Sequence, residues 1–213
     1  GAGVYIHTST VTLQKLVVRD CTAMQGGAVY AMDSQVDITN CEFTNNTAQA
    51  KGTAGGGAVF FGGRSSLMTL IGTSISHNTA GSACGGGLAA TDGTASVTGC
   101  TLEANTASNG GGICVQGAQL TVGGHTLISF NNASQQGGGI RAGSSSLVFN
   151  TVRFARNSAR LGGGLMCRLS DVTSDSVEVD ANQAVDGGGV YMLISTLSST
   201  NDMLMNNAAR SKG

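Results

Sequence analysis

Aliphatic residues recur along the chain at steps of 25 to 30 residues, and each follows two or three small residues, mostly glycine. The cleanest copy reads Gly110-Gly111-Gly112-Ile113. Self-similarity at a period of 20–50 residues is typical of solenoids and propellers. The pattern therefore predicts eight copies of one structural unit. Their aliphatic positions are Val4, Val29, Val59, Leu88, Ile113, Ile140, Leu165 and Val190.

Two further apolar columns follow the first within each repeat. In the repeat that starts at Leu165, Val172 and Val179 follow at steps of seven residues and Asn182 three residues later. A further step of eight residues leads to Val190, the start of the next repeat. The repeat that starts at Leu88 departs from this spacing, since its last two columns lie five residues apart. The second column is Val11, Val36, Leu67, Val97, Leu120, Leu147, Val172 and Leu197. The third is Val18, Phe43, Ile75, Leu102, Ile128, Phe154, Val179 and Leu204.

Within each segment the apolar residues alternate, as in Leu120/Val122 and Val177/Val179. A period of two predicts strands. Three short strands per repeat without a helical stretch predict an all-β, right-handed parallel β-helix of about eight rungs, where a rung is one turn of roughly 25 residues. A leucine-rich repeat shares the period, but the chain lacks its leucine motif. We expect residues 1–213 to form a single β-helix segment, a fragment of a longer repeat protein.

One asparagine recurs three residues after the third apolar column in most repeats. A buried asparagine that stacks on its neighbours can both donate and accept hydrogen bonds along the axis. It would satisfy turn amides that otherwise cost about 1–3 kcal/mol each when buried without a partner. We expect a structural ladder; a polar binding row is the alternative. The column contains Asn46, Asn78, Asn105, Asn131, Asn157, Asn182 and Asn207.

The residue after each first-column aliphatic faces outward by alternation. This outward column holds Tyr5, Tyr30 and Phe60 on consecutive rungs, then Arg141 and Tyr191 further along. A contiguous aromatic patch can mark a contact site for a partner. Cross-strand aromatic stabilisation is the other interpretation. These five residues are the candidate contact stripe.

The six cysteines show no metal-binding spacing, so neither a metal nor another cofactor is expected. Cys41, Cys100 and Cys167 fall at inward positions. If the first rung slips in register, Cys21 and Cys41 stack within reach of a disulfide bond. Two glycosylation sequons begin at Asn45 and Asn132.

Composition narrows the partner classes. The chain has 34 glycines, no proline and only 11% charged residues, with a net charge of −1. With so few charged residues and almost no net charge, the sequence lacks the excess of basic residues that nucleic-acid binding requires. No run of 18 apolar residues occurs, so no direct membrane insertion is expected in this segment. The glycines lack the lysine and helix of a phosphate-binding loop and are interpreted as turns.

Parallel β-helices also include polysaccharide lyases and hydrolases, so an enzyme must be considered. That chemistry needs two or three carboxylates at set distances. Here the carboxylates are spread over turns and sheets, and the best cluster is Arg141, Arg168 and Asp171. The three histidines lie in different columns. No catalytic residue is assigned.

The repeat resembles that of the polymorphic outer membrane proteins, surface adhesins of chlamydiae. The motifs that carry the resemblance are Gly26-Gly27-Ala28-Val29, Gly56-Gly57-Ala58-Val59, Phe43-Thr44-Asn45-Asn46 and Phe154-Ala155-Arg156-Asn157. The resemblance implies a non-enzymatic stalk, adhesin passenger or filament segment, extracellular or at the cell surface. It implies a protein or glycan partner, or other parts of the same extracellular assembly. A polysaccharide-active enzyme or a carbohydrate-binding β-helix is the alternative function.

Overall fold

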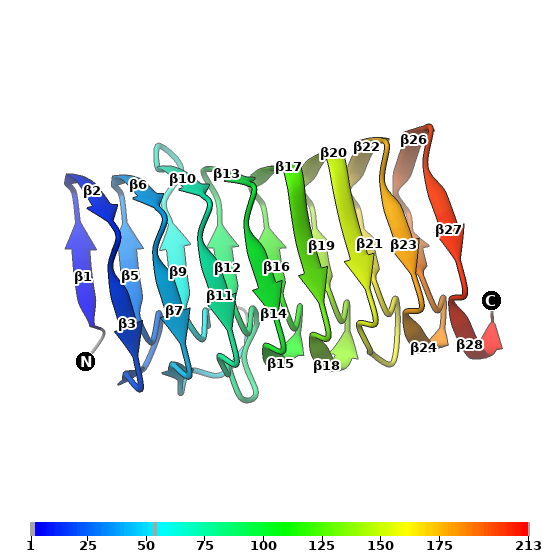
Figure 1. The fold of residues 1–213 in the computed structure, drawn as a ribbon, viewed down its shortest axis with the longest axis horizontal. Coiled ribbons are helices and arrows are strands. Elements are labelled where there is room, and N and C mark those ends of the chain that lie inside the picture. The colour runs from blue at the N-terminus through cyan, green and yellow to red at the C-terminus, as the bar shows by residue number, and fades with distance from the viewer. Residues whose placement is uncertain (1–2, 53–54, 213) are drawn as a thin grey trace.

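The computed structural model describes residues 3–52 and 55–212, and every regular element in these residues is a β-strand. Figure 1 shows strands of one sheet rising behind and strands of another descending in front as the chain advances from left to right, which is a right-handed winding. The first sheet has eight parallel strands. They are β1 (Val4–His7), β5 (Val29–Met32), β9 (Val59–Gly62), β12 (Leu88–Thr91), β16 (Ile113–Gln116), β19 (Ile140–Gly143), β21 (Leu165–Arg168) and β25 (Val190–Leu193).

The second and third strands of the rungs form a 14-stranded parallel sheet, because β17 and β20 continue through the bend that separates these positions elsewhere. The second positions are β2 (Thr10–Gln14), β6 (Gln35–Thr39), β10 (Leu67–Ile71), β13 (Thr94–Thr98), β17 (Gln119–Ser129), β20 (Ser146–Ala155), β22 (Asp171–Asp175) and β26 (Thr196–Thr200). The third positions that are separate strands are β3 (Val17–Arg19), β7 (Glu42–Thr44), β11 (Ser74–Ser76), β14 (Thr101–Glu103), β23 (Glu178–Asp180) and β27 (Met203–Met205).

A fourth, short strand follows the asparagine column in most rungs and was not predicted. Every one of these strands contains alanine, and each strand pairs with the same position one rung away. Ala48 and Ala107 of these strands, with Ala50, Ala80 and Ala83, form a small second core. The short strands are β4 (Thr22–Ala23), β8 (Thr47–Ala48), β15 (Thr106–Asn109), β18 (Asn132–Gln136), β24 (Gln183–Asp186) and β28 (Ala208–Lys212).

The core fills the interior of the solenoid with the inward residues of each strand. The predicted first and third columns are confirmed, since their members pair rung to rung in register. Phe43, Phe61 and Phe154 are the largest of the fully buried side chains. Alternation therefore gives the expected division into an apolar interior and a more polar exterior.

The second column is corrected at two rungs. Leu67 is 48% exposed, while its neighbour Met68 is 2% exposed and pairs with Val36 and Ala95. The third rung has an insertion before Leu67, which shifts the inward position by one residue. In the fourth rung the inward residue of this column is Ala95, and Val97 lies one inward position further on. With Ala95 in place, this rung also has the regular 7-7 spacing.

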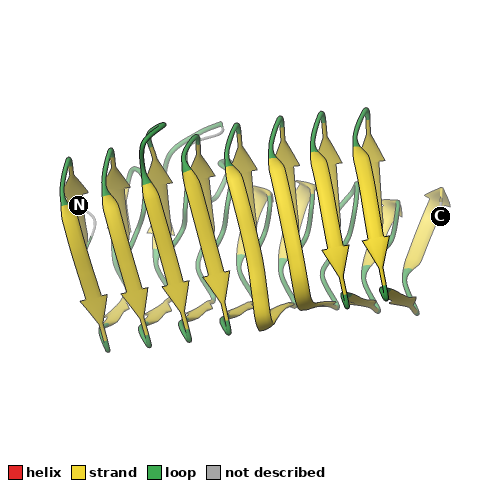
Figure 2. Ribbon diagram, turned by 90° about the horizontal axis from the view of Figure 1, so that it is seen from above, coloured by secondary structure: helices red, strands yellow, loops and turns green. Residues whose placement is uncertain are grey.

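Each rung turns at four corners, and one residue at most of them has a left-handed backbone conformation. Figure 2 shows these turns aligned along the rod between the strands. At the corner before the first sheet this residue is a glycine, such as Gly110 with φ 58°. A Cβ atom on Gly110 would lie 2.2 Å from the carbonyl oxygen of Ile113, so both the conformation and the space require glycine. The glycine motif is a turn, as the sequence predicts.

No helix long and apolar enough to cross a membrane occurs in the described part of the chain.

Candidate functional site

The asparagine column is joined by hydrogen bonds from rung to rung at the third corner. The backbone N–H and the Nδ2 amide of Asn157 both donate to Oδ1 of Asn182, and both donor–acceptor distances are 2.9 Å. The Nδ2 group also donates to the carbonyl oxygen of Ile128, at 2.8 Å. The same pattern repeats from Asn46 to Asn207. The side chains thus link each rung to the next.

Serine forms a second column, at the first corner, and sequence reasoning missed it. Ser145 Oγ donates to the carbonyl oxygen of Gly143, and the Ser145 N–H donates to Oγ of Ser170. Ser9, Ser34, Ser170 and Ser195 follow the same rule. A signal was present in the sequence: these serines lie five residues after the first-column aliphatic.

A third column at the second corner alternates threonine with cysteine. Thr73 N–H donates to Sγ of Cys100, and the Cys100 N–H donates to Oγ1 of Thr126. Cys41 N–H donates in turn to Oγ1 of Thr73. The predicted inward positions of Cys41, Cys100 and Cys167 are confirmed by their burial. Burial raises the pKa of the Cys167 thiol to about 12.

The predicted disulfide between Cys21 and Cys41 is wrong, because both thiols are free. Cys21 lies in the asparagine column, where its N–H donates to Oδ1 of Asn46, so it belongs to a different corner from Cys41. The structure instead joins Cys84 to Cys114, with Cα atoms 5.5 Å apart. Cys84 lies in the irregular segment before β12, where the rung has an insertion, so repeat spacing could not place it.

The aromatic end of the outward column is a stack of rings on three rungs. Tyr5 and Tyr30 have ring centroids 5.1 Å apart and nearly parallel planes, and Tyr30 and Phe60 are 5.3 Å apart. Tyr5 is 70% exposed, but Phe60 is 2% exposed and is therefore not part of an accessible stripe. Burial, with Tyr5 and Asp33 as smaller causes, raises the pKa of Tyr30. Aromatic stabilisation between rungs accounts for Phe60.

The cationic end of the outward column lies on β19. Nη1 of Arg141 donates to Oε1 of Gln116 on the preceding rung, over 2.6 Å. Burial, and then the charge of Arg168, lowers the pKa of Arg141. Tyr191, the last predicted member, is half-buried on β25. Met166, which lies between Arg141 and Tyr191 in the outward column, is buried.

The suggested catalytic cluster lacks its carboxylate. Asp171 accepts a hydrogen bond from Thr196 Oγ1 at 2.5 Å, and no ion pair joins it to Arg141 or Arg168 among the described residues. Nor does that part of the chain hold a group of three or more histidine, cysteine or acidic residues suited to a metal ion.

Both sequon asparagines lie on the surface. Asn45 is exposed at a corner, where its Nδ2 donates to Asp20. Asn132 is exposed at the start of β18 and accepts a hydrogen bond from Ser158. Their glycosylation stays a prediction.

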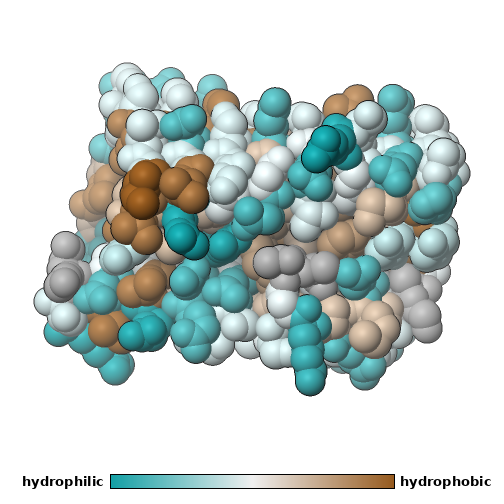
Figure 3. All heavy atoms as spheres, turned by 180° about the vertical axis from the view of Figure 1, so that it is seen from behind, coloured by the Kyte–Doolittle hydropathy of each residue, from teal (hydrophilic) through white to brown (hydrophobic). Residues whose placement is uncertain are grey.

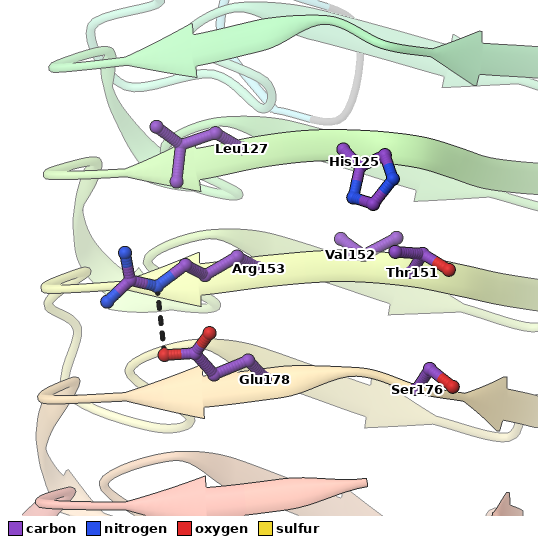
Figure 4. A pocket seen from close by; sticks show the side chains of 7 residues that line it. All are labelled: His125, Leu127, Thr151, Val152, Arg153, Ser176 and Glu178. Carbon is purple, nitrogen blue, oxygen red and sulfur yellow. Dashed lines mark ion pairs between the residues drawn. The ribbon is translucent and has the colours of Figure 1, made fainter. Parts of the chain in front are cut away.

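A shallow groove of about 350 Å³ crosses three rungs on the outside of the large sheet. Figure 4 shows Arg153 beside Glu178 along one part of it and His125 near Thr151 and Ser176 along the other. Arg153 pairs with Glu178 at 3.0 Å and with Asp180 at 3.1 Å, so its charge is already compensated. The groove exists beside the register shift between Gly123 and Thr126 in β17.

Apolar side chains gather on the outside of the last rungs, on the left of Figure 3. Leu169, Leu193 and Ile194 are exposed there. Leu169 and Ile194 occupy left-handed corner positions, with φ of 53° and 51°, that direct their side chains toward solvent. In the earlier rungs, polar or glycine residues such as Thr8 and Asp33 occupy the same corner.

Comparison with known proteins identifies one repeat. The family model of the Chlamydia polymorphic membrane protein repeat matches residues 40–62, which contain Phe43-Thr44-Asn45-Asn46 and Gly56-Gly57-Ala58-Val59. No curated protein and no solved structure matches the chain. The chain is thus a parallel β-solenoid that carries a repeat of the Chlamydia polymorphic membrane protein type.

Proposed function

We propose that this chain is a non-enzymatic segment of a longer extracellular or cell-surface β-solenoid. It acts there as a stalk or adhesive passenger that presents side chains at a fixed pitch. The proposal rests on the asparagine column, whose hydrogen bonds run unbroken from Asn46 to Asn207. A continuous ladder of buried side chains holds every rung to the next and favours a stiff rod over a set of mobile modules.

The last described rung presents an apolar surface suited to contact with a neighbouring unit. Leu197 and Leu204 occupy inward columns whose other members are mostly buried, yet they are 49% and 60% exposed on the last rung. Apolar surface of this kind is normally covered in a solenoid, either by another repeat or by a capping unit.

The matched repeat supports the surface location. Proteins with this repeat type include outer-membrane and surface autotransporters, and a disulfide such as Cys84–Cys114 persists in oxidising compartments. Both observations favour the outside of the cell.

The location can be tested by treating intact cells that make the protein with a membrane-impermeant protease and detecting this segment with an antibody. We expect cleavage or antibody binding without permeabilisation. A segment that becomes accessible only after the cells are permeabilised would refute the surface assignment. An intracellular protein serves as the control for cell integrity.

The stalk function can be tested by deleting one complete rung, residues 162–186. The deletion joins Leu161 to Gly187. Leu161 has the rung position of Asp186, and Gly187 has that of Gly162, so the junction keeps the register of the repeat. We expect a folded protein whose rod is shorter by about 4.8 Å. Deleting residues 162–174 in its place removes a partial rung, breaks all the columns and should abolish folding. Equal tolerance of both deletions would contradict the model of a continuous rod.

A further inference from the structure

Two arginines lie on neighbouring strands of the outward face of the first sheet. Arg141 pairs with Met166, and Gly143 pairs with Arg168, so Arg141 and Arg168 are diagonal neighbours on adjacent rungs. Side chains in this relation are within reach of each other when they are long. The lowered pKa of Arg141, to which the charge of Arg168 contributes, agrees with that proximity.

The Arg141 guanidinium is held in a fixed place. It is bound to Oε1 of Gln116, and it lies over Gly143, where a Cβ atom would come within 2.9 Å of Nη1 and 2.6 Å of the Gln116 oxygen. Gly143 has an ordinary backbone conformation, since no left-handed φ is found there. The absence of a side chain at this position therefore makes room for the guanidinium.

The pair has no acidic counterpart in residues 3–52 and 55–212. Neither arginine takes part in an ion pair with a carboxylate of these residues, and Asp171, the carboxylate that follows Arg168 most closely, is bound to Thr196. Two like charges, one of them on the half-buried Arg141, repel each other when no anion compensates them. Guanidinium groups in this arrangement suit an oxyanion, which they bind with charge-assisted hydrogen bonds.

We propose that Arg141 and Arg168, with Gln116, form a binding site for the carboxylate or sulfate groups of an acidic polysaccharide laid along the outward face of the first sheet. The inference deepens the proposed adhesive function, because it names the chemistry of the partner.

A polysaccharide fits this face better than an acidic protein. The neighbours of Arg141 in the outward column are Cys114 and Met166, and both are buried. Toward the earlier rungs the face therefore lacks the exposed aromatic or aliphatic side chains that anchor most protein partners, and the exposed apolar residue Leu193 lies on the other side, beside Arg168 on the following rung. The outward positions that lead to Arg168 from the earlier rungs include Thr91 and Gln116. Both are half-buried polar side chains.

The test measures binding of the 213-residue chain to a sulfated heparin-type oligosaccharide, a polyuronate oligosaccharide, a neutral dextran of similar size and poly-glutamate, at low salt. Arg141→Gln and Arg168→Gln remove one charge each. Arg19→Gln is the matched control, since Arg19 is an exposed arginine on β3, far along the rod. Gly143→Ala keeps all charges and displaces the guanidinium. Circular dichroism confirms that each variant is folded.

We expect both acidic oligosaccharides to bind and dextran not to bind. Each arginine substitution in the site should weaken binding about ten-fold, and Arg19→Gln should leave it within about two-fold. Gly143→Ala should also weaken binding. Loss of affinity that is equal for Arg19→Gln and Arg141→Gln, or no binding of either oligosaccharide, would overturn the site. Tighter, Arg141-dependent binding of poly-glutamate would overturn the polysaccharide assignment. These measurements use the isolated chain, so they are independent of where the cell places the segment.

Discussion

Replacing Asn157 by alanine removes one link from the middle of the asparagine ladder. The Asn157 side chain is fully buried. Its Oδ1 accepts hydrogen bonds from the N–H and Nδ2 of Asn131, both at 3.0 Å, and its Nδ2 donates to the carbonyl oxygen of Ile128. Alanine can replace none of these contacts.

The size of the effect follows from the groups that are left without partners. Asn131 Nδ2 keeps its bond to the Leu102 carbonyl, and Asn182 Oδ1 keeps the backbone N–H of residue 157. The Asn131 N–H and the Ile128 carbonyl each lose a partner in a buried place, at a cost of about 1–3 kcal/mol per group. We therefore expect the variant to lose about 2–4 kcal/mol of unfolding free energy, since the carbonyl oxygen has a second lone pair for other donors.

Urea denaturation followed by circular dichroism measures this loss, and hydrogen exchange at the Asn131 amide reports it locally. The matched control is Asn150→Ala, an exposed asparagine on β20 of the same rung, which should change stability by less than about 0.5 kcal/mol. The slope of free energy against urea should be equal in both variants, which keeps the comparison valid. A loss below about 0.5 kcal/mol for Asn157→Ala would refute the ladder as a source of stability.

Three further predictions concern the cysteines and one corner. Serine at both Cys84 and Cys114 should lower the unfolding free energy by about 3–4 kcal/mol, from the 30-residue separation, while Cys21→Ser should change it little in the same denaturation assay; equal effects would contradict the disulfide. The folded state keeps the Cys167 proton up to a pKa of about 12, whereas the unfolded chain loses it near the ordinary value of 9.0. Stability should fall as the pH rises between these values, and a Cys167→Ala variant with an unchanged alkaline slope in pH titration would refute this cause. Ile194→Gly should raise the melting temperature, because it removes about 1 kcal/mol of strain at a left-handed, exposed position; a lower melting temperature would show that Ile194 contributes contacts.

Much of the fold could be predicted because a solenoid repeats its constraints. The glycine motif, the alternation and the asparagine spacing each recur in most rungs, so an error in one rung changes little. The errors lie where a rung carries an insertion. The spacing predicts Leu67 as the inward residue, but an insertion at the first corner moves Met68 there. It predicts Val97 in place of Ala95, because alanine is a weak apolar signal beside valine.

The candidate site was harder to predict from the sequence, because it depends on which outward-facing side chains are covered by their neighbours and which are exposed. Periodicity placed Phe60 and Arg141 in one column correctly, but it could not show that Phe60 is buried. It also could not show that Gly143 leaves room for Arg141, since a strand glycine has the same signature whether or not a side chain crosses it. The partner of Cys114 required the path of an irregular segment.

The bond between Cys84 and Cys114 also determines how the rod would yield under mechanical load. A solenoid pulled from its two ends would release one rung at a time, and each rung of about 25 residues adds roughly 80–90 Å of extended chain. The cross-link closes residues 84–114 into a covalent loop, so this length cannot be extended while the bond is intact. The segment from the third to the fifth rung would then remain short while its neighbours lengthen, and a reducing agent would add the missing length.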